Sequence, residues 1–132
     1  MLIYMQIGPA DKFGKIDPKK MIHGTSKDRG HLLWIPVASF SVSDDRSRHK
    51  REALCYRVVD GTSAKLFKMA LPKSAPMMII VDMVDGNSTT TLKFTDAVLS
   101  RFSTTARIDG VDAKGPIESM AISFTSLQVV KK

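Results

Sequence analysis

The sequence predicts a mostly β fold: an antiparallel β-barrel or a two-sheet sandwich with one short α-helix at about residues 63–71. About seven apolar, β-prone segments alternate with clusters of Gly, Pro, Asp, Asn and Ser, which is the pattern of strands and turns. The spacing of apolar residues matches that of a helix in only one segment of the sequence. At 132 residues and 43% hydrophobic composition the chain can build one ordinary core, so residues 1–132 are expected to form a single domain.

The first predicted strand spans residues 2–7, LIYMQI, and ends before Gly8 and Pro9. Residues 10–29 mix Lys, Asp, Pro and Gly, and we expect them to form a long connection with a short strand near Met21. A loop of this length in a compact domain is usually functional or interfacial.

Two further strands are predicted in the first half of the chain. One spans about Leu33 to Val42, and because Pro36 cannot donate to a sheet ladder, this strand is expected at an edge or a bulge. The other spans residues 51–59, REALCYRVV, whose alternation is typical of a strand. Its Glu-Ala-Leu start leaves a helix as the alternative, but its β-branched and aromatic end favours a strand.

The single predicted helix lies within residues 60–72, DGTSAKLFKMALP. Thr62 or Ser63 can cap its amino end, and Pro72 ends it. Two to three turns are too few for a helix to be stable alone in water, so it must pack against the sheet. Its apolar stripe consists of Leu66, Phe67, Met69 and Ala70.

The second half is predicted to be a run of strands. Residues 76–84 are apolar on both faces, which suits a strand between a sheet interior and the helix or a neighbouring subunit. The dipeptide Asp85-Gly86 is a strong hairpin signal and leads into residues 89–95. A separate strand is expected at residues 96–104.

The last predicted strand spans residues 117–130, IESMAISFTSLQVV. Its apolar side chains alternate up to Phe124, and then Leu127 and Val129 fall in the opposite phase. A bulge near Thr125 or Ser126 would reconcile the two halves.

A β structure of this kind must protect its sheet edges. Strands that are apolar on both faces, together with Pro36 near the expected edge, are compatible with a neighbouring copy completing the sheet. Head-to-tail pairing whose rotation closes would give a ring.

The net charge of +7 and the densest basic cluster, RSRHKR at residues 46–51, raise the question of a nucleic-acid partner. The cluster can contact phosphates, but aromatic residues make up only 7% of the chain and no glycine-aromatic repeat supplies stacking platforms. Nucleic acid is therefore not the expected partner, although a basic β-barrel that binds single strands stays an alternative. The candidate contact loop consists of Arg46, Arg48, His49, Lys50 and Arg51.

No catalytic, cofactor-binding or metal-binding residue is predicted, and we do not expect an enzyme. The three histidines lie in polar connections without the spacing of a metal site. Cys55 is the only cysteine, and its place in an alternating strand predicts a buried, unreactive thiol. A small hydrolase that uses Cys55 is the remaining enzyme hypothesis.

No apolar run approaches the roughly 18 residues of a membrane span. The amino-terminal residues lack the pattern of a secretory signal, so we expect synthesis and folding in the cytoplasm. The single cysteine agrees with a reducing compartment.

Residues 24–41, GTSKDRGHLLWIPVASFS, join a polar turn to an apolar run, and they resemble a segment of the Hcp family, the haemolysin-coregulated proteins of type VI secretion systems. Residues 60–66 are similar to that family's D-x-x-S-x-x-L signature, residues 92–104 to its L-x-D-x-x-x-S strand pair, and residues 117–130 to its closing strand. The matches cover nearly the whole chain in order. The motif residues are Gly24, Ser26, Asp28, Gly30, His31, Trp34, Ile35, Phe40, Asp60, Ser63, Leu66, Glu118 and Ser119.

The resemblance implies a β-barrel with one helix, assembled into homo-hexameric rings that stack as a hollow tube. A contractile sheath would propel this tube out of the cell, with a spike protein at its tip and, in some members, effectors in its lumen. It further implies assembly in the cytoplasm and secretion without a cleaved signal peptide. A phage-type tail tube protein is the near alternative, because those tubes use a related fold.

One segment departs from the family pattern. The connection after Val42 is short and Arg-rich, where many members carry a longer, glycine-rich segment. Within the motif, Gly24, Asp28 and Gly30 are expected to shape the connection before Trp34, with His31 as a supporting hydrogen-bonding residue.

Overall fold

The computed structural model describes residues 1–45, 50–69, 76–105 and 115–131. This part of the chain contains eight strands, one α-helix and one short 3-10 helix. The elements are β1 (Leu2–Gly8), η1 (Arg29–His31), β2 (Ile35–Val37), β3 (Ser39–Asp45), β4 (Lys50–Val58), α1 (Ser63–Met69), β5 (Met77–Asp85), β6 (Ser88–Thr105), β7 (Ile117–Ser123) and β8 (Ser126–Lys131).

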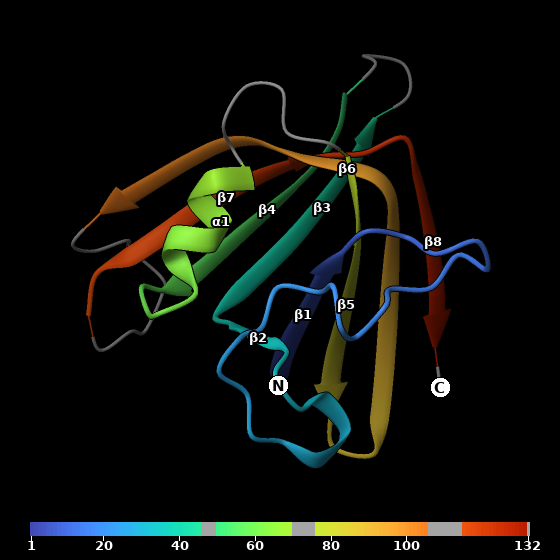
Figure 1. Cartoon of the computed structure of the whole chain (residues 1–132), viewed down its shortest axis with the longest axis horizontal. Coiled ribbons are helices and arrows are strands. Elements are labelled where there is room, and N and C mark those ends of the chain that lie inside the picture. Colours follow the sequence, from blue (N-terminus) through green and yellow to red (C-terminus); the bar gives the residue numbers. More distant parts are fainter. Residues whose placement is uncertain (46–49, 70–75, 106–114, 132) are drawn as a thin grey trace.

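The strands form two antiparallel sheets that share β6 (Figure 1). The first sheet has the order β2-β1-β5-β6-β8, and the second has the order β6-β7-β4-β3. The mostly β fold with one short helix is confirmed. The path of paired strands runs from β2 to β3 without a pairing between these two, so the sheet is not a closed barrel.

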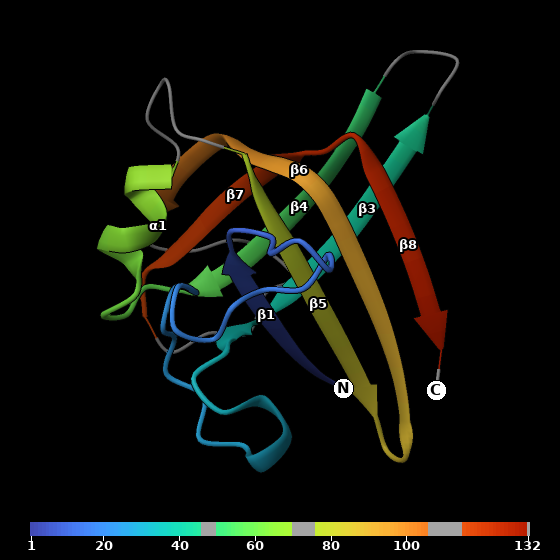
Figure 2. The ribbon, with the colours of Figure 1, turned by 45° about the vertical axis from the view of Figure 1, so that its right-hand side comes forward.

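Strand β6 passes continuously from one sheet to the other, where the sequence predicted two strands (Figure 2). Its first half pairs with β5 and β8, and its second half pairs with β7. The bend lies at Asp96, which has a φ of +52°. Asp is one of the residues that tolerates this conformation, so the bend needs no glycine.

The predicted strand from Leu33 to Val42 is also wrong in its extent. It is divided at Ala38, whose N–H donates to the carbonyl of Tyr56 at 2.8 Å. As a result β2 joins the first sheet while β3 joins the second. Pro36 lies in β2, which pairs only with β1 among the described strands, and this confirms the predicted edge position.

Two other expectations need correction. The change of phase near Thr125 marks the end of β7 and the start of β8, so the chain changes sheets there instead of forming a bulge. The short strand expected near Met21 is absent from the described residues, where the N–H of Met21 instead bonds the carbonyl of Asp17. The predicted hairpin at Asp85-Gly86 is confirmed, because Asp85 pairs with Ser88.

The core lies between the two sheets. Phe94 of β6 is fully buried, with its ring centroid 5.8 Å from that of Phe40 and 4.9 Å from that of Phe124. Leu66 is fully buried and anchors α1, whereas Phe67 in the same predicted stripe is 51% exposed. The expectations for Ala70, Pro72 and the side chain of Met69 fall outside what the structure describes.

Strand β4 confirms the strand interpretation of residues 51–59 and excludes the helix alternative. Its core-facing residues are Ala53, Cys55 and Arg57, all of them buried. Burial of Cys55 raises the pKa of its thiol to about 12, so the predicted unreactive thiol has a physical cause.

Replacing Phe94 by Ala should lower the free energy of unfolding by about 3–5 kcal/mol, because it removes a fully buried ring at the centre of the core. Urea denaturation followed by circular dichroism measures this change. Phe67→Ala is the matched control and should cost about 1 kcal/mol or less. Equal losses in the two variants would contradict this account of the core.

The Cys55 thiol should not react with Ellman's reagent at pH 8 in the folded protein, because its pKa of about 12 leaves almost no thiolate. Reaction should become complete in denaturant. Rapid reaction of the native protein would contradict the burial of Cys55.

Candidate functional site

Residues 24–35, here called the motif loop, form a narrow turn that leads into β2. The N–H of Gly24 donates to the carbonyl of Leu33 at 2.7 Å, and the N–H of Ser26 donates to the carbonyl of Trp34 at 3.0 Å. A Cβ at Gly24 would lie 2.4 Å from the carbonyl oxygen of Trp34 and 2.7 Å from the Cα of Ile35. Because both obstacles are backbone atoms, this close approach requires glycine.

The buried hydroxyl of Ser26 accepts a hydrogen bond from the N–H of Asp28 at 3.2 Å. This Ser-turn precedes the η1 helix, where the N–H of His31 donates to the carbonyl of Asp28 at 3.1 Å. Several backbone groups of the loop are therefore paired within the loop, and His31 faces the first sheet.

His31 connects the motif loop to the first sheet. Its Nδ1 lies 2.8 Å from Asp28 Oδ2, and its Nε2 lies 2.8 Å from Asp82 Oδ2 on β5. The imidazole stacks on Tyr4 of β1 at 4.3 Å and meets the edge of Trp34 at 4.9 Å. The geometry is that of a structural tether, since both ring nitrogens are held by carboxylates.

A second cluster, here called the Arg57 cluster, consists of Arg57, Asp60 and Glu118. Arg57 is 1% exposed and Glu118 is 0% exposed, and they face each other across β4 and β7. The guanidinium donates through Nη1 to Glu118 Oε1, and through Nη2 to Asp60 Oδ2 at 2.7 Å. Its Nε donates to the carbonyl of Pro36 at 3.4 Å.

The cluster is tied to the motif loop and to α1. Thr25 Oγ1 donates to Asp60 Oδ2 at 3.2 Å, and the N–H of Thr62 donates to Asp60 Oδ1 at 2.8 Å. The N–H of Asp60 donates in turn to Ser63 Oγ at 3.0 Å. Burial disfavours the Asp60 anion, but Arg57 and the N–H of Thr62 outweigh it and lower the pKa of Asp60.

The remaining motif residues take no part in the His31 contacts or in the Arg57 cluster. Ile35 is fully buried in the core, and the partly buried Phe40 packs on Phe94. Ser119 Oγ lies 2.7 Å from Ser103 Oγ across β6 and β7. Gly30 lies within η1.

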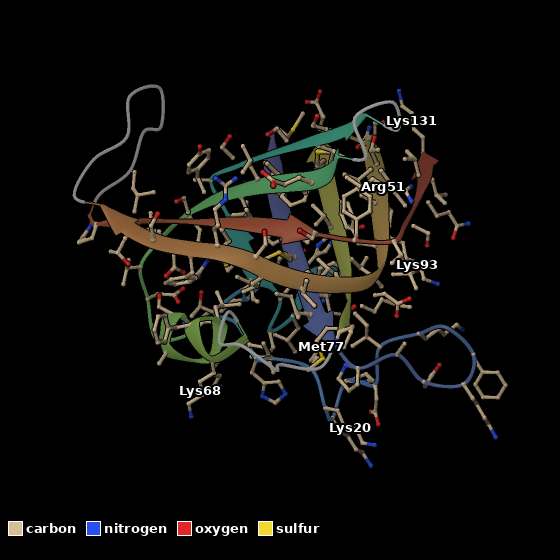
Figure 3. All side chains as sticks on the ribbon, turned by 90° about the horizontal axis from the view of Figure 1, so that it is seen from above. Lys20, Arg51, Lys68, Met77, Lys93 and Lys131 are labelled. Carbon is tan, nitrogen blue, oxygen red and sulfur yellow. The ribbon has the colours of Figure 1, made fainter. Side chains whose placement is uncertain are left out.

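The predicted contact loop is only partly visible. Arg46, Arg48 and His49 lie outside the described residues, as does the side chain of Lys50. Arg51 donates to the carbonyl of Thr125 and lies 5.3 Å from the ring centroid of Phe124. Figure 3 shows Arg51 on the same side of the molecule as Lys93 and Lys131.

The described residues contain no group of three or more His, Cys, Asp or Glu side chains placed to hold a metal ion. In this part of the chain no helix is long and apolar enough to span a membrane. A depression of about 340 Å³ lies beside the Arg57 cluster and is lined by Thr25, Pro36, Val37, Ala38, Arg57, Val58 and Asp60.

Sequence reasoning missed Arg57, the residue that joins several motif positions. An Arg between Tyr56 and Val58 is usually a solvent-facing residue of an alternating strand. The only available signal was Glu118 in another β-prone segment, because a buried Arg needs a carboxylate partner.

Replacing Arg57 by Met should lower the free energy of unfolding by about 3–5 kcal/mol, since it leaves the Glu118 carboxylate buried without its cation. The double variant with Arg57→Met and Glu118→Leu should recover most of that loss. Urea denaturation of both variants measures the difference. If the double variant is less stable than Arg57→Met alone, the loss does not come from burying the Glu118 carboxylate without its cation.

No protein-family model matches the chain, and no curated protein matches it in sequence. Solved structures do match. Hcp2 from Salmonella typhimurium is 19% identical with a TM-score of 0.67, and the alignment covers 99% of this chain and 94% of that one. Hcp1 from the E. coli EAEC 042 pathovar is 10% identical with a TM-score of 0.72, over 100% and 98% of the two chains.

A more distant match is a chain in the sheath-tube complex of PVC, an extracellular contractile injection system. It is 11% identical with a TM-score of 0.54, and the alignment covers 97% of this chain and 87% of that one. Because the alignments extend over almost the whole length of each chain, the likeness concerns the complete arrangement of strands. The chain therefore has the fold of the Hcp proteins of type VI secretion systems.

Proposed function

We propose that the chain is a structural subunit of a tube, assembled as homo-hexameric rings that stack into a hollow cylinder. The observation that carries this proposal is the full-length likeness in fold to several Hcp proteins and to a chain of a sheath-tube complex. The motifs of the motif loop, of the start of α1 and of β7 agree with it.

The strand edges give this proposal physical support. Among the described strands, β8 pairs with β6 alone, and β3 pairs with β4 alone. Val129 and Val130 of β8 are 58% and 39% exposed, and Val42 of β3 is 36% exposed. Unpaired edges with exposed apolar residues favour association, so a neighbouring copy would protect them.

The same proposal implies further components around the tube. A contractile sheath would surround the tube, a spike protein would cap it, and effectors could travel in its lumen. The subunit would assemble in the cytoplasm and be secreted without a cleaved signal peptide. We propose no catalytic role, and the basic side of the molecule with Arg51 would serve as a protein contact surface.

A phage-type tail tube is the second candidate, and a specific observation bears on it. The fold of the chain also resembles that of a chain in the sheath-tube complex of an extracellular contractile injection system, which supports a tube role in contractile systems more widely. Its TM-score of 0.54 is lower than the 0.67 and 0.72 of the two Hcp structures, which favours the type VI assignment.

The purified chain should form a particle of several times its 14.6 kDa mass, with a central hole in negative-stain images. Light scattering across a concentration series gives the mass, and the images give the symmetry. A chain that stays strictly monomeric at the highest concentration would contradict the tube proposal in its simple form.

A further inference from the structure

We propose that the exposed ring of Phe13 inserts into the apolar depression beside the Arg57 cluster of a second copy of this chain. The residues of the two surfaces are here called the Phe13 turn (11–15) and the Arg57 pocket (Thr25, Pro36, Val37, Ala38, Arg57, Val58 and Asp60). This inference rests on the proposed self-assembly and goes further by naming the surfaces that meet.

Phe13 is 75% exposed, yet it is not on a loose segment. The N–H of Asp11 donates to the carbonyl of Lys15 at 2.7 Å, and Asp11 Oδ1 accepts the N–H groups of Phe13 at 2.8 Å and of Lys15 at 2.9 Å. Gly14 has a φ of +73°, which closes the turn. The structure thus holds an aromatic ring in solvent on a preformed turn, which lowers the entropic cost of binding.

The turn is also anchored to the body of the protein. Ala10 and Ile16 form an antiparallel bridge at its base. Ile16 is buried, and its Cγ2 lies close to Gly8 at the end of β1. The backbone of the Phe13 turn is therefore held in a defined position relative to the first sheet.

The Arg57 pocket has the size and lining to receive such a ring. Its volume is about 340 Å³, and four of its seven lining residues, Pro36, Val37, Ala38 and Val58, are apolar. Val58 remains 38% exposed at the end of β4. Removing both the ring and these side chains from water is favourable, and a buried aromatic commonly anchors an interface.

Opposite local charges on the Phe13 segment and the Arg57 cluster favour a second copy of this chain as the occupant of the pocket. Residues 9–20 contain four Lys and two Asp, a local charge of +2. The Arg57 cluster contains two carboxylates and one guanidinium, a local charge of −1. The Nζ of Lys12 lies 5.2 Å from the ring centroid of Phe13, so this ammonium would approach the pocket together with the ring.

Asp60 is the acidic group within reach. Its side chain lines the pocket and is 27% exposed, whereas the side chains of Arg57 and Glu118 are buried. The chain as a whole carries +7, so two copies repel at most orientations. Contact between the basic turn and the partly exposed Asp60 carboxylate at the pocket reduces that repulsion and favours one orientation.

The Phe13 turn and the Asp60 end of the pocket lie far apart. The segment that follows β1 reaches its far end beside β8, on the side away from α1, in Figure 1, whereas Asp60 of the pocket lies three residues before the start of α1. One chain therefore cannot fill its own pocket with its own turn. The resulting contact is head-to-tail, the kind that closes as a ring or continues as a stack.

Cross-linking tests the contact directly. Lys15→Cys places a thiol on the exposed Phe13 turn and keeps the ring. When Lys15→Cys and Ala38→Cys variants are purified separately and mixed under mild oxidation, they should form a disulfide-linked dimer that contains one copy of each variant. Native Cys55 does not compete, because it is fully buried and its pKa is about 12. The matched control replaces Lys15→Cys by Leu32→Cys, since Leu32 is 60% exposed on the motif loop. Equal yields with Leu32→Cys would overturn the proposed contact.

Association gives a second readout. Phe13→Ala should weaken self-association at least tenfold in sedimentation experiments, while Leu32→Ala leaves it unchanged. The melting temperature of Phe13→Ala should match that of the wild type, since the ring is mostly exposed. Rings that form with unchanged affinity in Phe13→Ala would overturn this contact alone, whereas a monomeric wild-type chain would contradict the tube proposal itself.

Discussion

The buried guanidinium of Arg57 is the interaction on which the arrangement of this protein depends. All three of its nitrogens donate, to Glu118, to Asp60 and to the carbonyl of Pro36. These contacts hold β4 against β7, β2 against β4, and the start of α1 against both. Burying two charged groups costs several kcal/mol per ion, so the cluster is stable only while every partner is in place. Because a buried ion pair often adds no more stability than apolar side chains of similar volume, the cluster acts more by fixing position than by adding stability.

Much of the fold could be predicted because its signals are local. Alternation identified the strands, Asp85-Gly86 identified a hairpin, and one change of period identified α1. The strand boundaries were predicted wrongly where the same local sequence is compatible with either a turn or a continuous strand. Asp96 favours a turn, yet here it bends one continuous strand, and Ala38 carries no breaking signal although the chain changes sheets there. Only the partners of each segment decide between these outcomes.

The candidate site was harder to predict than the fold, because its contacts join residues that are distant in sequence. His31 was expected to bond within its turn, which it does, but its second partner Asp82 lies 51 positions away. Arg57 and Glu118 are separated by 61 positions. Phe13 gave no signal at all, since a single aromatic residue in a polar loop belongs to no periodic pattern.

The continuity of β6 has a mechanical consequence. Two sheets held only by side-chain packing could slide over each other under load, but here one unbroken backbone belongs to both ladders. Displacing one sheet along the other would break many hydrogen bonds of β6 at once. The register shifts beside Asp96 also oppose sliding of β6 along β5 or β7. A force applied to either sheet is therefore passed to the other through the β6 backbone, which opposes sliding of the two sheets.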